Sequence, residues 1–340
     1  MSKLDECILG DLVEFQRGYD LPKSKFVEGK YPVQSSNGIL GYHNEYKVEG
    51  PGITIGRSGT VGTPHLIREN FFPHNTSLFV KEFKGNDIEY IYYLLQYLDL
   101  GNQKSGSGVP TMNRNHLHPI KIRAYRDKTY QQRTIKILSL IDKKIQINNQ
   151  INQELEAMAK TLYDYWFVQF DFRDQNGKPY KSSGGKMVYN PELKREIPEG
   201  WGVESVGNLL DKVTKAEKIE NNSIEFIGEI PVIDQSQKYI AGFTNNENAI
   251  LQPQDGHVIF GDHTRVVKYI NFDYARGADG TQVLISNNEN ISNVLLYHMI
   301  EDFDLSNYGY ARHFKFLKEK TVIVPDKEVS SKFETQLCYS

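Results

Sequence analysis

Residues 129–172 read TYQQRTIKILSLIDKKIQINNQINQELEAMAKTLYDYWFVQFDF and contain neither glycine nor proline. Apolar side chains recur along this segment three or four positions apart, which is the spacing of one face of an α-helix. The stripe consists of Leu138, Ile141, Ile145, Ile151, Leu155, Met158, Leu162 and Tyr165. This pattern predicts a long amphipathic helix of the coiled-coil type over residues 129–172.

The polar Asn148 lies on the same stripe, and one polar residue in a narrow apolar seam is typical of a helix that pairs with one or two partners. A core helix of a larger bundle is the alternative interpretation. Forty helical residues at about 1.5 Å each would span roughly 60 Å, more than the joining of adjacent domains requires. We therefore predict a spacer helix. Its predicted subunit interface consists of Leu138, Ile141, Ile145, Ile151, Leu155, Met158 and Leu162.

The segments on either side of this helix resemble each other. Residues 9–13 (LGDLV) recur as 206–210 (VGNLL), 31–34 (YPVQ) as 230–233 (IPVI), 52–55 (GITI) as 256–259 (GHVI), and 75–80 (NTSLFV) as 280–285 (GTQVLI). The offset between the copies drifts only from 197 to 205. The constant order of these matches predicts an internal duplication.

Each copy consists of short β-branched and aromatic runs bounded by Gly, Asn and Pro, which predicts irregular β-rich domains and an α+β fold class. The predicted organisation is a first β-rich domain over residues 1–128, the helix over 129–172, a linker over 173–200, a second β-rich domain over 201–328, and the start of another helix over 329–340.

Composition places the chain among folded, soluble proteins. Hydrophobic residues make up 39% and charged residues 24% of the 340 residues, and no apolar run approaches the roughly 18 residues of a membrane span. The N-terminus carries charges where a secretory signal has its apolar core. Cys7 and Cys338 fit neither a disulfide framework nor a metal-ligand spacing. A cytoplasmic location is expected.

Charge is distributed unevenly along the chain. The formal net charge is −3, with +2 over residues 1–128, +3 over 129–196 and −8 over 197–340. A protein that binds nucleic acid through a generally basic surface is therefore excluded, and any DNA contact must come from local patches.

The motifs of common catalytic sites are missing. No Gly-x4-Gly-Lys-Ser/Thr phosphate loop and no Gly-x-Gly-x-x-Gly after a predicted strand occurs, and the nine histidines form no His-x3-His pair. A methyltransferase would need a cofactor-binding glycine motif and an Asn/Asp-Pro-Pro-Tyr/Phe tetrad, and neither is found. We predict a binding protein without catalytic residues, metal site or cofactor of its own.

Polar and basic loops occur in both copies. Residues 56–62 (GRSGTVG) form a glycine-rich turn that is either an ordinary hairpin or a phosphate and base contact. Residues 104–116 and 306–318 combine Asn, Arg, His and Lys, and Arg can bind guanine and Asn adenine through paired hydrogen bonds. Residues 265–276 hold a second basic group, for which a solvated hairpin is the simpler account. The predicted DNA-binding residues are Arg57, Ser58, Lys104, Asn113, Arg114, Asn115, Arg312, His313 and Lys315.

These motifs together resemble the specificity (S) subunit of type I restriction-modification enzymes over nearly the whole chain. The resemblance is carried by residues 9–12 (LGDL), 56–62, 106–110 (GSGVP), Asn113-Arg114 with Leu117, 131–135 (QQRTI), 155–163 (LEAMAKTLY) and 197–201 (IPEGW). It implies a non-catalytic DNA reader with two target-recognition domains, one for each part of an asymmetric bipartite sequence. It also implies binding to methyltransferase (M) subunits that use S-adenosylmethionine, and to restriction (R) subunits that use ATP and Mg²⁺.

The sequence departs from the family pattern at its end. In the family a second long helix pairs antiparallel with the first, whereas here the chain stops at Ser340, soon after that helix begins. The stripe is then expected to find another partner, either a second copy, a fragment with the missing helix, or the methyltransferase subunits. The alternative function is a truncated or silent variant that acts as a protein scaffold without sequence-specific DNA binding.

Overall fold

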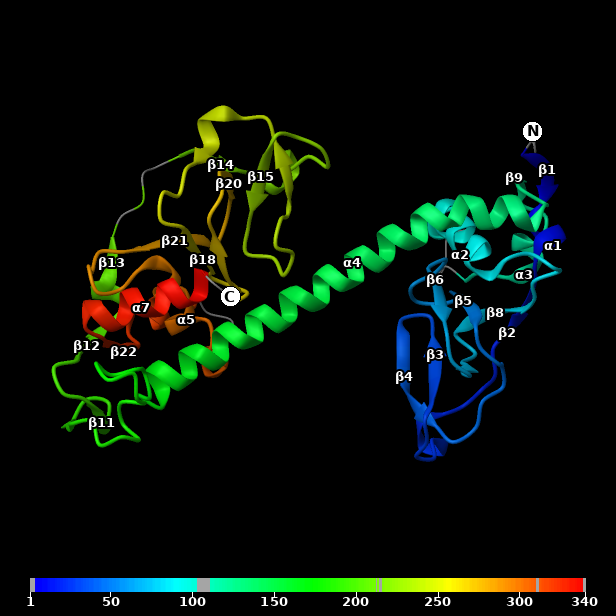
Figure 1. The fold of residues 1–340 in the computed structure, drawn as a ribbon. Helices are drawn as coiled ribbons and strands as arrows, with labels where there is room; N and C mark the ends of the chain where they lie inside the picture. The colour runs from blue at the N-terminus through cyan, green and yellow to red at the C-terminus, as the bar shows by residue number, and fades with distance from the viewer. Residues whose placement is uncertain (1–3, 103–110, 212, 214–215, 310–311, 339–340) are drawn as a thin grey trace. The chain divides into compact units, whose positions relative to one another are not determined.

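The segment without glycine or proline forms the helix α4 (Lys128–Tyr163), and a π-helical turn, η3 (Asp164–Val168), continues it. The computed structural model describes residues 4–102, 111–211, 213, 216–309 and 312–338 (Figure 1). The chain divides into two compact units, Met1–Asn149 and Gln150–Ser340, and α4 begins in the first and ends in the second. Strands dominate each unit on either side of the helix, which confirms the α+β fold class with a long intervening helix.

The first unit consists of two main sheets and a strand pair. Its four-stranded sheet has the order β2-β8-β5-β6, its three-stranded sheet the order β4-β3-β7, and β1 pairs with β9. The elements are β1 (Asp5–Ile8), α1 (Leu9–Leu12), β2 (Glu14–Arg17), η1 (Lys23–Lys25), β3 (Tyr31–Ser35), β4 (Gly38–His43), β5 (Gly52–Gly56), β6 (Pro64–Ile67), β7 (Phe72–Pro73), β8 (Ser77–Glu82), α2 (Ile88–Tyr97), η2 (Leu100–Asn102), α3 (Arg114–Leu117) and β9 (Lys121–Ala124).

The second unit has the same plan with a longer element list. It contains β10 (Met187–Asn190), β11 (Arg195–Pro198), β12 (Gly202–Ser205), η4 (Val206–Leu209), β13 (Leu210–Asp211), β14 (Lys218–Ile219), η5 (Asn221–Ser223), β15 (Ile230–Ile233), β16 (Gly242–Thr244), η6 (Glu247–Ala249), β17 (Ile250–Leu251), β18 (His257–Gly261), β19 (Val267–Ile270), β20 (Tyr274–Gly277), β21 (Thr281–Ser286), α5 (Asn293–Ile300), η7 (Ser306–Tyr308), α6 (Phe314–Lys318), β22 (Thr321–Val324) and α7 (Lys327–Cys338).

The strand order confirms the duplication. The order β13-β21-β18-β19 repeats β2-β8-β5-β6, and the pair β12-β22 repeats β1-β9. In both units a central strand pairs antiparallel on one side and parallel on the other, β3 with β4 and β7, and β15 with β16 and β20. Each unit therefore buries its own apolar core around the same framework.

Aromatic side chains fill the core of the second unit where α4 ends. Phe333 of α7 is fully buried and lies 5.0 Å, centroid to centroid, from Phe167. Trp166 and Trp201 are also buried, and the Trp201 ring stacks on Phe172 at 5.1 Å. These contacts join the end of α4, the start of the β-rich part and α7 into a single core.

Residues 173–200 differ from the predicted linker. They contain the antiparallel pair β10-β11, Ile197 is buried in the core of the second unit, and the Tyr180 ring stacks on Phe172 at 4.7 Å. The glycines and prolines that suggested a linker form the turns of a folded segment. Its scattered apolar side chains pack onto residues distant in sequence, which local composition does not reveal.

A search of the described helices for a span long and apolar enough to cross a membrane found none.

Candidate nucleic-acid interface

Arg57 joins three loops of the first unit through its main chain. Its N–H donates to the Thr76 carbonyl at 2.9 Å, and its carbonyl accepts from the Met112 N–H at 2.8 Å. The β5–β6 turn, the β7–β8 turn and the segment that leads into α3 thereby meet at one place. Arg57 and Ser58 are half-buried at this junction.

Glycines make this junction possible. A Cβ on Gly56 would lie 1.7 Å from the Thr60 carbonyl oxygen, and a Cβ on Gly62, whose φ is +84°, would lie 2.2 Å from the Gly101 nitrogen. The turn of residues 56–62 is therefore closed by backbone packing that no other residue type permits. The turn is thus more tightly built than an ordinary hairpin needs to be.

Asn37 holds the same turn from the neighbouring sheet. Its Oδ1 accepts hydrogen bonds from the Thr60 N–H at 3.2 Å and the Thr60 hydroxyl at 2.5 Å. Asn37 was not among the predicted residues, although Asn37-Gly38 is a turn signature between two strands. Asn37 adds the β3–β4 turn to the loops that meet around Arg57.

The start of α3 carries the other predicted residues of the first unit. Asn113, Arg114 and Asn115 are exposed, and Asn113 caps the helix because its Oδ1 accepts from the Asn115 N–H at 3.1 Å. An adenine contact through both amide atoms of Asn113 would require this cap to open. The predicted Lys104 lies outside the described residues.

His118, the residue that follows α3, anchors the end of this helix to β2. Its Nε2 accepts a hydrogen bond from the Phe15 N–H at 3.0 Å, and its ring stacks on the Phe15 ring at 5.9 Å. Desolvation lowers the pKa of His118 below its ordinary value of 6.5, and the charges of Lys84 and Arg114 lower it further. The acceptor role of Nε2 requires the neutral ring with its proton on Nδ1.

We expect the first unit to lose stability as the pH falls below about 6.5. The unfolded chain has the ordinary His118 pKa and binds a proton first, so the loss begins at 6.5 and continues down to the lowered folded-state pKa. Urea unfolding followed by far-UV circular dichroism between pH 8 and 5.5 measures it. His118→Gln should flatten the dependence, and an equal slope in that variant would contradict the assignment.

The second unit repeats the junction with different side chains. Asp262 takes the place of Arg57, because its N–H donates to the Gly280 carbonyl at 2.7 Å and its carbonyl accepts from the His313 N–H at 2.9 Å. The Asp262 carboxylate also accepts from the Phe314 N–H at 2.8 Å, at the first turn of α6. Equivalent turns thus present an arginine in one unit and a buried carboxylate in the other.

The prediction that His313 contacts DNA is contradicted by its burial. The ring is 3% exposed, and its Nδ1 lies 3.0 Å from the Asp262 carbonyl oxygen. A side chain enclosed in this way positions α6 on the turn and cannot reach a base or phosphate. Arg312 and Lys315, on either side of it, are exposed.

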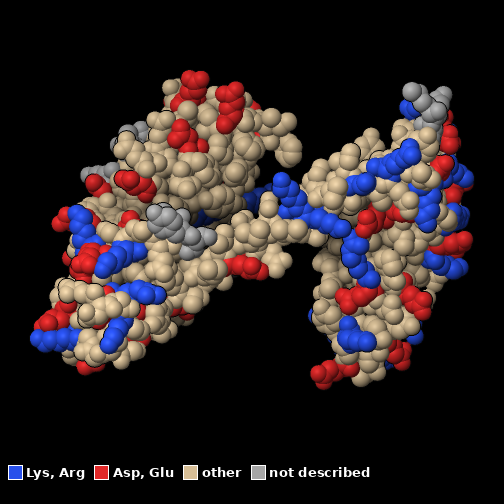
Figure 2. Space-filling model, viewed as in Figure 1, with Lys and Arg blue, Asp and Glu red and all other residues tan. Residues whose placement is uncertain are grey.

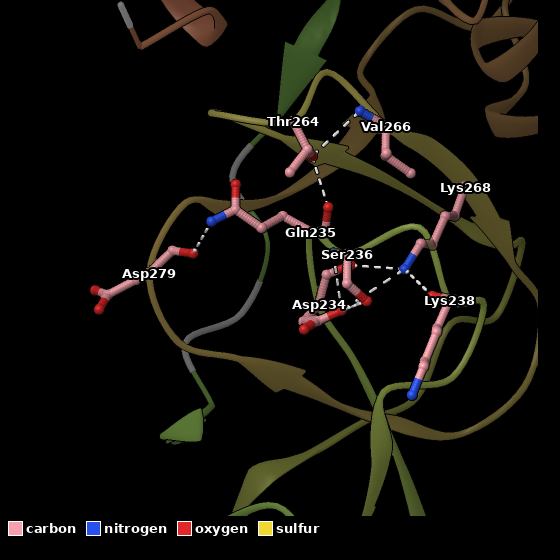
Figure 3. Close-up of polar contacts among 8 residues, drawn as sticks. All are labelled: Asp234, Gln235, Ser236, Lys238, Thr264, Val266, Lys268 and Asp279. Carbon is pink, nitrogen blue, oxygen red and sulfur yellow. Dashed lines mark hydrogen bonds and ion pairs between the residues drawn. The ribbon is translucent and has the colours of Figure 1, made fainter. Parts of the chain in front are cut away.

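Gln235 links three turns of the second unit (Figure 3). Its Oε1 accepts from the His263 N–H at 3.1 Å, and its Nε2 donates to the Asp279 carbonyl at 2.9 Å. The Gln235 carbonyl accepts from the Thr264 hydroxyl at 2.6 Å. Neighbouring residues along the chain do not reveal this role, because the partners lie 28 to 44 positions away.

Lys268 stabilises the turn that follows β15. Its ammonium group donates to the carbonyls of Asp234 at 2.8 Å and Lys238 at 2.6 Å, and the Asp234 carboxylate lies 3.8 Å away (Figure 3). The side chain is 4% exposed, so burial lowers the pKa of Lys268, and Asp234 partly opposes this effect. Lys268 is therefore a buried tether within the basic group at residues 265–276.

Charge differs between parts of the surface. Figure 2 shows Asp and Glu side chains gathered over the part of the second unit that holds β14 and β15. The exposed acidic residues there are Glu217, Glu220, Glu225, Glu229 and Glu247. This part would repel DNA phosphates and is therefore unsuited to contact DNA.

The apolar stripe of α4 is mainly exposed. Leu138, Ile141, Ile145, Ile151, Leu155 and Met158 have exposed fractions of 39–58%. Leu162 instead packs against the core of the second unit. Across the part of the chain that the structure describes, no group of three His, Cys, Asp or Glu side chains could hold a metal ion.

Comparisons with known proteins agree with this architecture. Residues 1–157 match the family described as Type I restriction modification DNA specificity domain. The chain is 31% identical over 142 residues to the Type I restriction enzyme MjaIX specificity subunit of Methanocaldococcus jannaschii, covering 41% of this chain and 30% of that protein. It is 24% identical over 151 residues to the Type I restriction enzyme EcoprrI specificity subunit of Escherichia coli, covering 43% and 37%.

A short segment and a solved structure extend the similarity. Over 67 residues the chain is 49% identical to the Type I restriction enzyme HindI specificity subunit of Haemophilus influenzae, covering 20% of this chain and 14% of that protein. The matched segments thus span about a third or less of the curated relatives. The crystal structure of a type I restriction-modification S subunit from M. genitalium has the same fold, with a TM-score of 0.63 at 15% identity, over 98% of this chain and 88% of that one. The similarity to type I restriction modification DNA specificity domains is therefore carried by residues 1–157 of this chain.

Proposed function

We propose that this chain is the specificity subunit of a type I restriction-modification system and reads an asymmetric, bipartite DNA sequence. The observation that carries the proposal is the repeated junction at Arg57 and Asp262. The same main-chain hydrogen bonds gather the same loops in both units, yet the side chains presented there differ. Two similar frameworks with different loop chemistry are suited to two unlike half-sites.

In this function the chain itself is not catalytic. Its predicted DNA contacts are the exposed residues Asn113, Arg114, Asn115, Arg312 and Lys315, with half-buried Arg57 and Ser58. The half-exposed stripe of α4 would bind the methyltransferase subunits, a second copy of the chain or a fragment with the missing helix, and the complete complex would include restriction subunits. S-adenosylmethionine, ATP and Mg²⁺ would belong to those partner subunits, in the cytoplasm.

The test is a selection of DNA sequences. The purified chain, with and without its methyltransferase subunit, is mixed with a randomised duplex pool, and the retained DNA is sequenced at moderate salt. We expect two fixed and unlike half-sites at a constant spacing. The affinity for the retained DNA should fall as the salt concentration rises, because phosphate contacts release counterions. Absence of any enriched sequence in both mixtures would exclude the proposal and favour a scaffold.

A further inference from the structure

We infer that Arg265, on the β18–β19 turn, is a specificity-determining residue that contacts a base of the half-site read by the second unit. This inference rests on the proposed function and assigns to Arg265 the role that we predict for Arg57 in the first unit. It comes from comparing the two turns of the same chain.

The two turns start alike and then differ. Each turn follows a glycine that ends an inner strand of its sheet, Gly56 of β5 or Gly261 of β18. The Gly56 N–H donates across its turn to the Thr63 carbonyl at 3.1 Å, and the Gly261 N–H donates to the Val266 carbonyl at 2.8 Å. The next residue is Arg57 in the first unit and Asp262 in the second. Asp262 is 3% exposed and its carboxylate holds α6, so this position is closed to DNA.

In the second unit the turn carries its arginine three positions after Asp262. Residues 262–266 read DHTRV, and Arg265 is the one arginine or lysine among them. Arg265 is exposed, whereas Lys268 is buried and holds main-chain carbonyls. Of the basic side chains on this hairpin, Arg265 is therefore the one placed to reach a ligand.

The backbone of Arg265 is held in an unusual conformation. Its φ is +64°, in the left-handed region that residues other than glycine rarely adopt. The Arg265 N–H donates to the Gly261 carbonyl at 2.7 Å, and the preceding Thr264 is tied to Gln235 through its hydroxyl (Figure 3). Because the backbone of this turn is already held, binding does not have to order the loop, which favours directional contacts from its side chains.

Neighbouring charges favour a base contact over a phosphate contact. Hydrogen bonds from Ser306 are the main cause that lowers the pKa of Asp304, and the charges of Arg265 and Lys320 contribute further. Arg265 thus lies within electrostatic reach of a carboxylate, in a segment of net charge −8. Non-specific attraction to phosphates is weak there, so paired hydrogen bonds to a guanine edge contribute a larger share. Exposed Arg312 and Lys315, which the Asp262 contact with α6 brings to this turn, are the other predicted DNA contacts beside Arg265.

The test compares variants of the equivalent turns in the full chain with its methyltransferase subunit, by the same selection from randomised duplex DNA. For Arg265→Ala we expect one half-site and the spacing to stay unchanged. Preference at one base pair of the other half-site should fall roughly five- to 150-fold. Arg57→Ala, the matched control, should relax the opposite half-site. This reciprocal result would support the inference and assign each half-site to its unit.

Two further variants separate the side chain from the backbone. Arg265→Gly adopts φ +64° without strain, so it should fold at least as well as wild type and lose the same base preference. Arg265→Lys keeps the charge but not the planar pair of donors, so it should lose the preference while its salt dependence stays the same.

Three outcomes would overturn the inference. If Arg265→Ala keeps the full base preference while the wild type selects two half-sites, the assignment of Arg265 is wrong and the proposed function still stands. Equal weakening on all sequences, with the salt slope reduced by about one, makes Arg265 a phosphate contact. A wild type that selects no sequence overturns the proposed function, and this inference with it.

Discussion

Replacing Phe333 by alanine should lower the free energy of unfolding of the second unit by about 3–5 kcal/mol. The Phe333 ring is fully buried and contacts the rings of Tyr163, Trp166, Phe167 and His298 from α4, η3 and α5. Alanine would leave a cavity at the place where three helical segments meet. Because such a core relaxes only partly, the lost transfer energy and the cavity both contribute.

The measurement uses the two tryptophans of the chain, Trp166 and Trp201, which both lie in this core. Their fluorescence during urea unfolding reports on the second unit. Phe226→Ala is the matched control in the same unit, because Phe226 is 93% exposed and its removal should change stability by less than about 0.5 kcal/mol. Equal midpoints for the two variants would show that Phe333 does not hold α7 in this core.

Replacing Gln131 by leucine should destabilise the first unit by about 3 kcal/mol. Gln131, in the first turns of α4, is fully buried and satisfies three groups at once. Its Oε1 accepts from the Asp87 N–H at 2.8 Å, and its Nε2 donates to Asn86 Oδ1 and to the Tyr125 carbonyl, each at 2.7 Å. Leucine fills a similar volume but leaves these buried groups without their partner.

The control for Gln131 is its neighbour. Gln132 is exposed, and its hydrogen bond to the Asp87 carboxylate is long, at 3.4 Å, so Gln132→Leu should change stability by less than about 0.5 kcal/mol. Far-UV circular dichroism should show an earlier transition for Gln131→Leu, while tryptophan fluorescence stays the same because both tryptophans lie in the second unit. A shift in the fluorescence transition instead would contradict the assignment to the first unit.

Several features could be predicted from local patterns. The absence of glycine and proline and the regular apolar spacing predicted a helix over residues 129–172. The observed α4 begins at Lys128 but ends at Tyr163, followed by a π-helical turn to Val168. The order of the repeated segments predicted the duplication that the strand orders confirm. The turn at residues 56–62 was visible through its glycines, and the charge of −8 located the acidic half of the chain. All of these depend on spacing, order or composition along the chain.

Other features depended on which residues meet after folding. Asn37, Gln235 and Lys268 look like ordinary polar residues in sequence, but each holds loops that are 23 to 44 positions away. His313 lies in a basic stretch that seemed suited to DNA, but folding buries it against Asp262.

Burial and hydrogen-bond partners are set by contacts between distant segments, and composition does not encode those contacts locally. Sequence alone therefore determined the helix, the repeat and the family resemblance, because each follows from periodicity, motifs or order along the chain. Only the tertiary structure decided which polar side chains hold the loops together and which, such as Arg265, remain exposed.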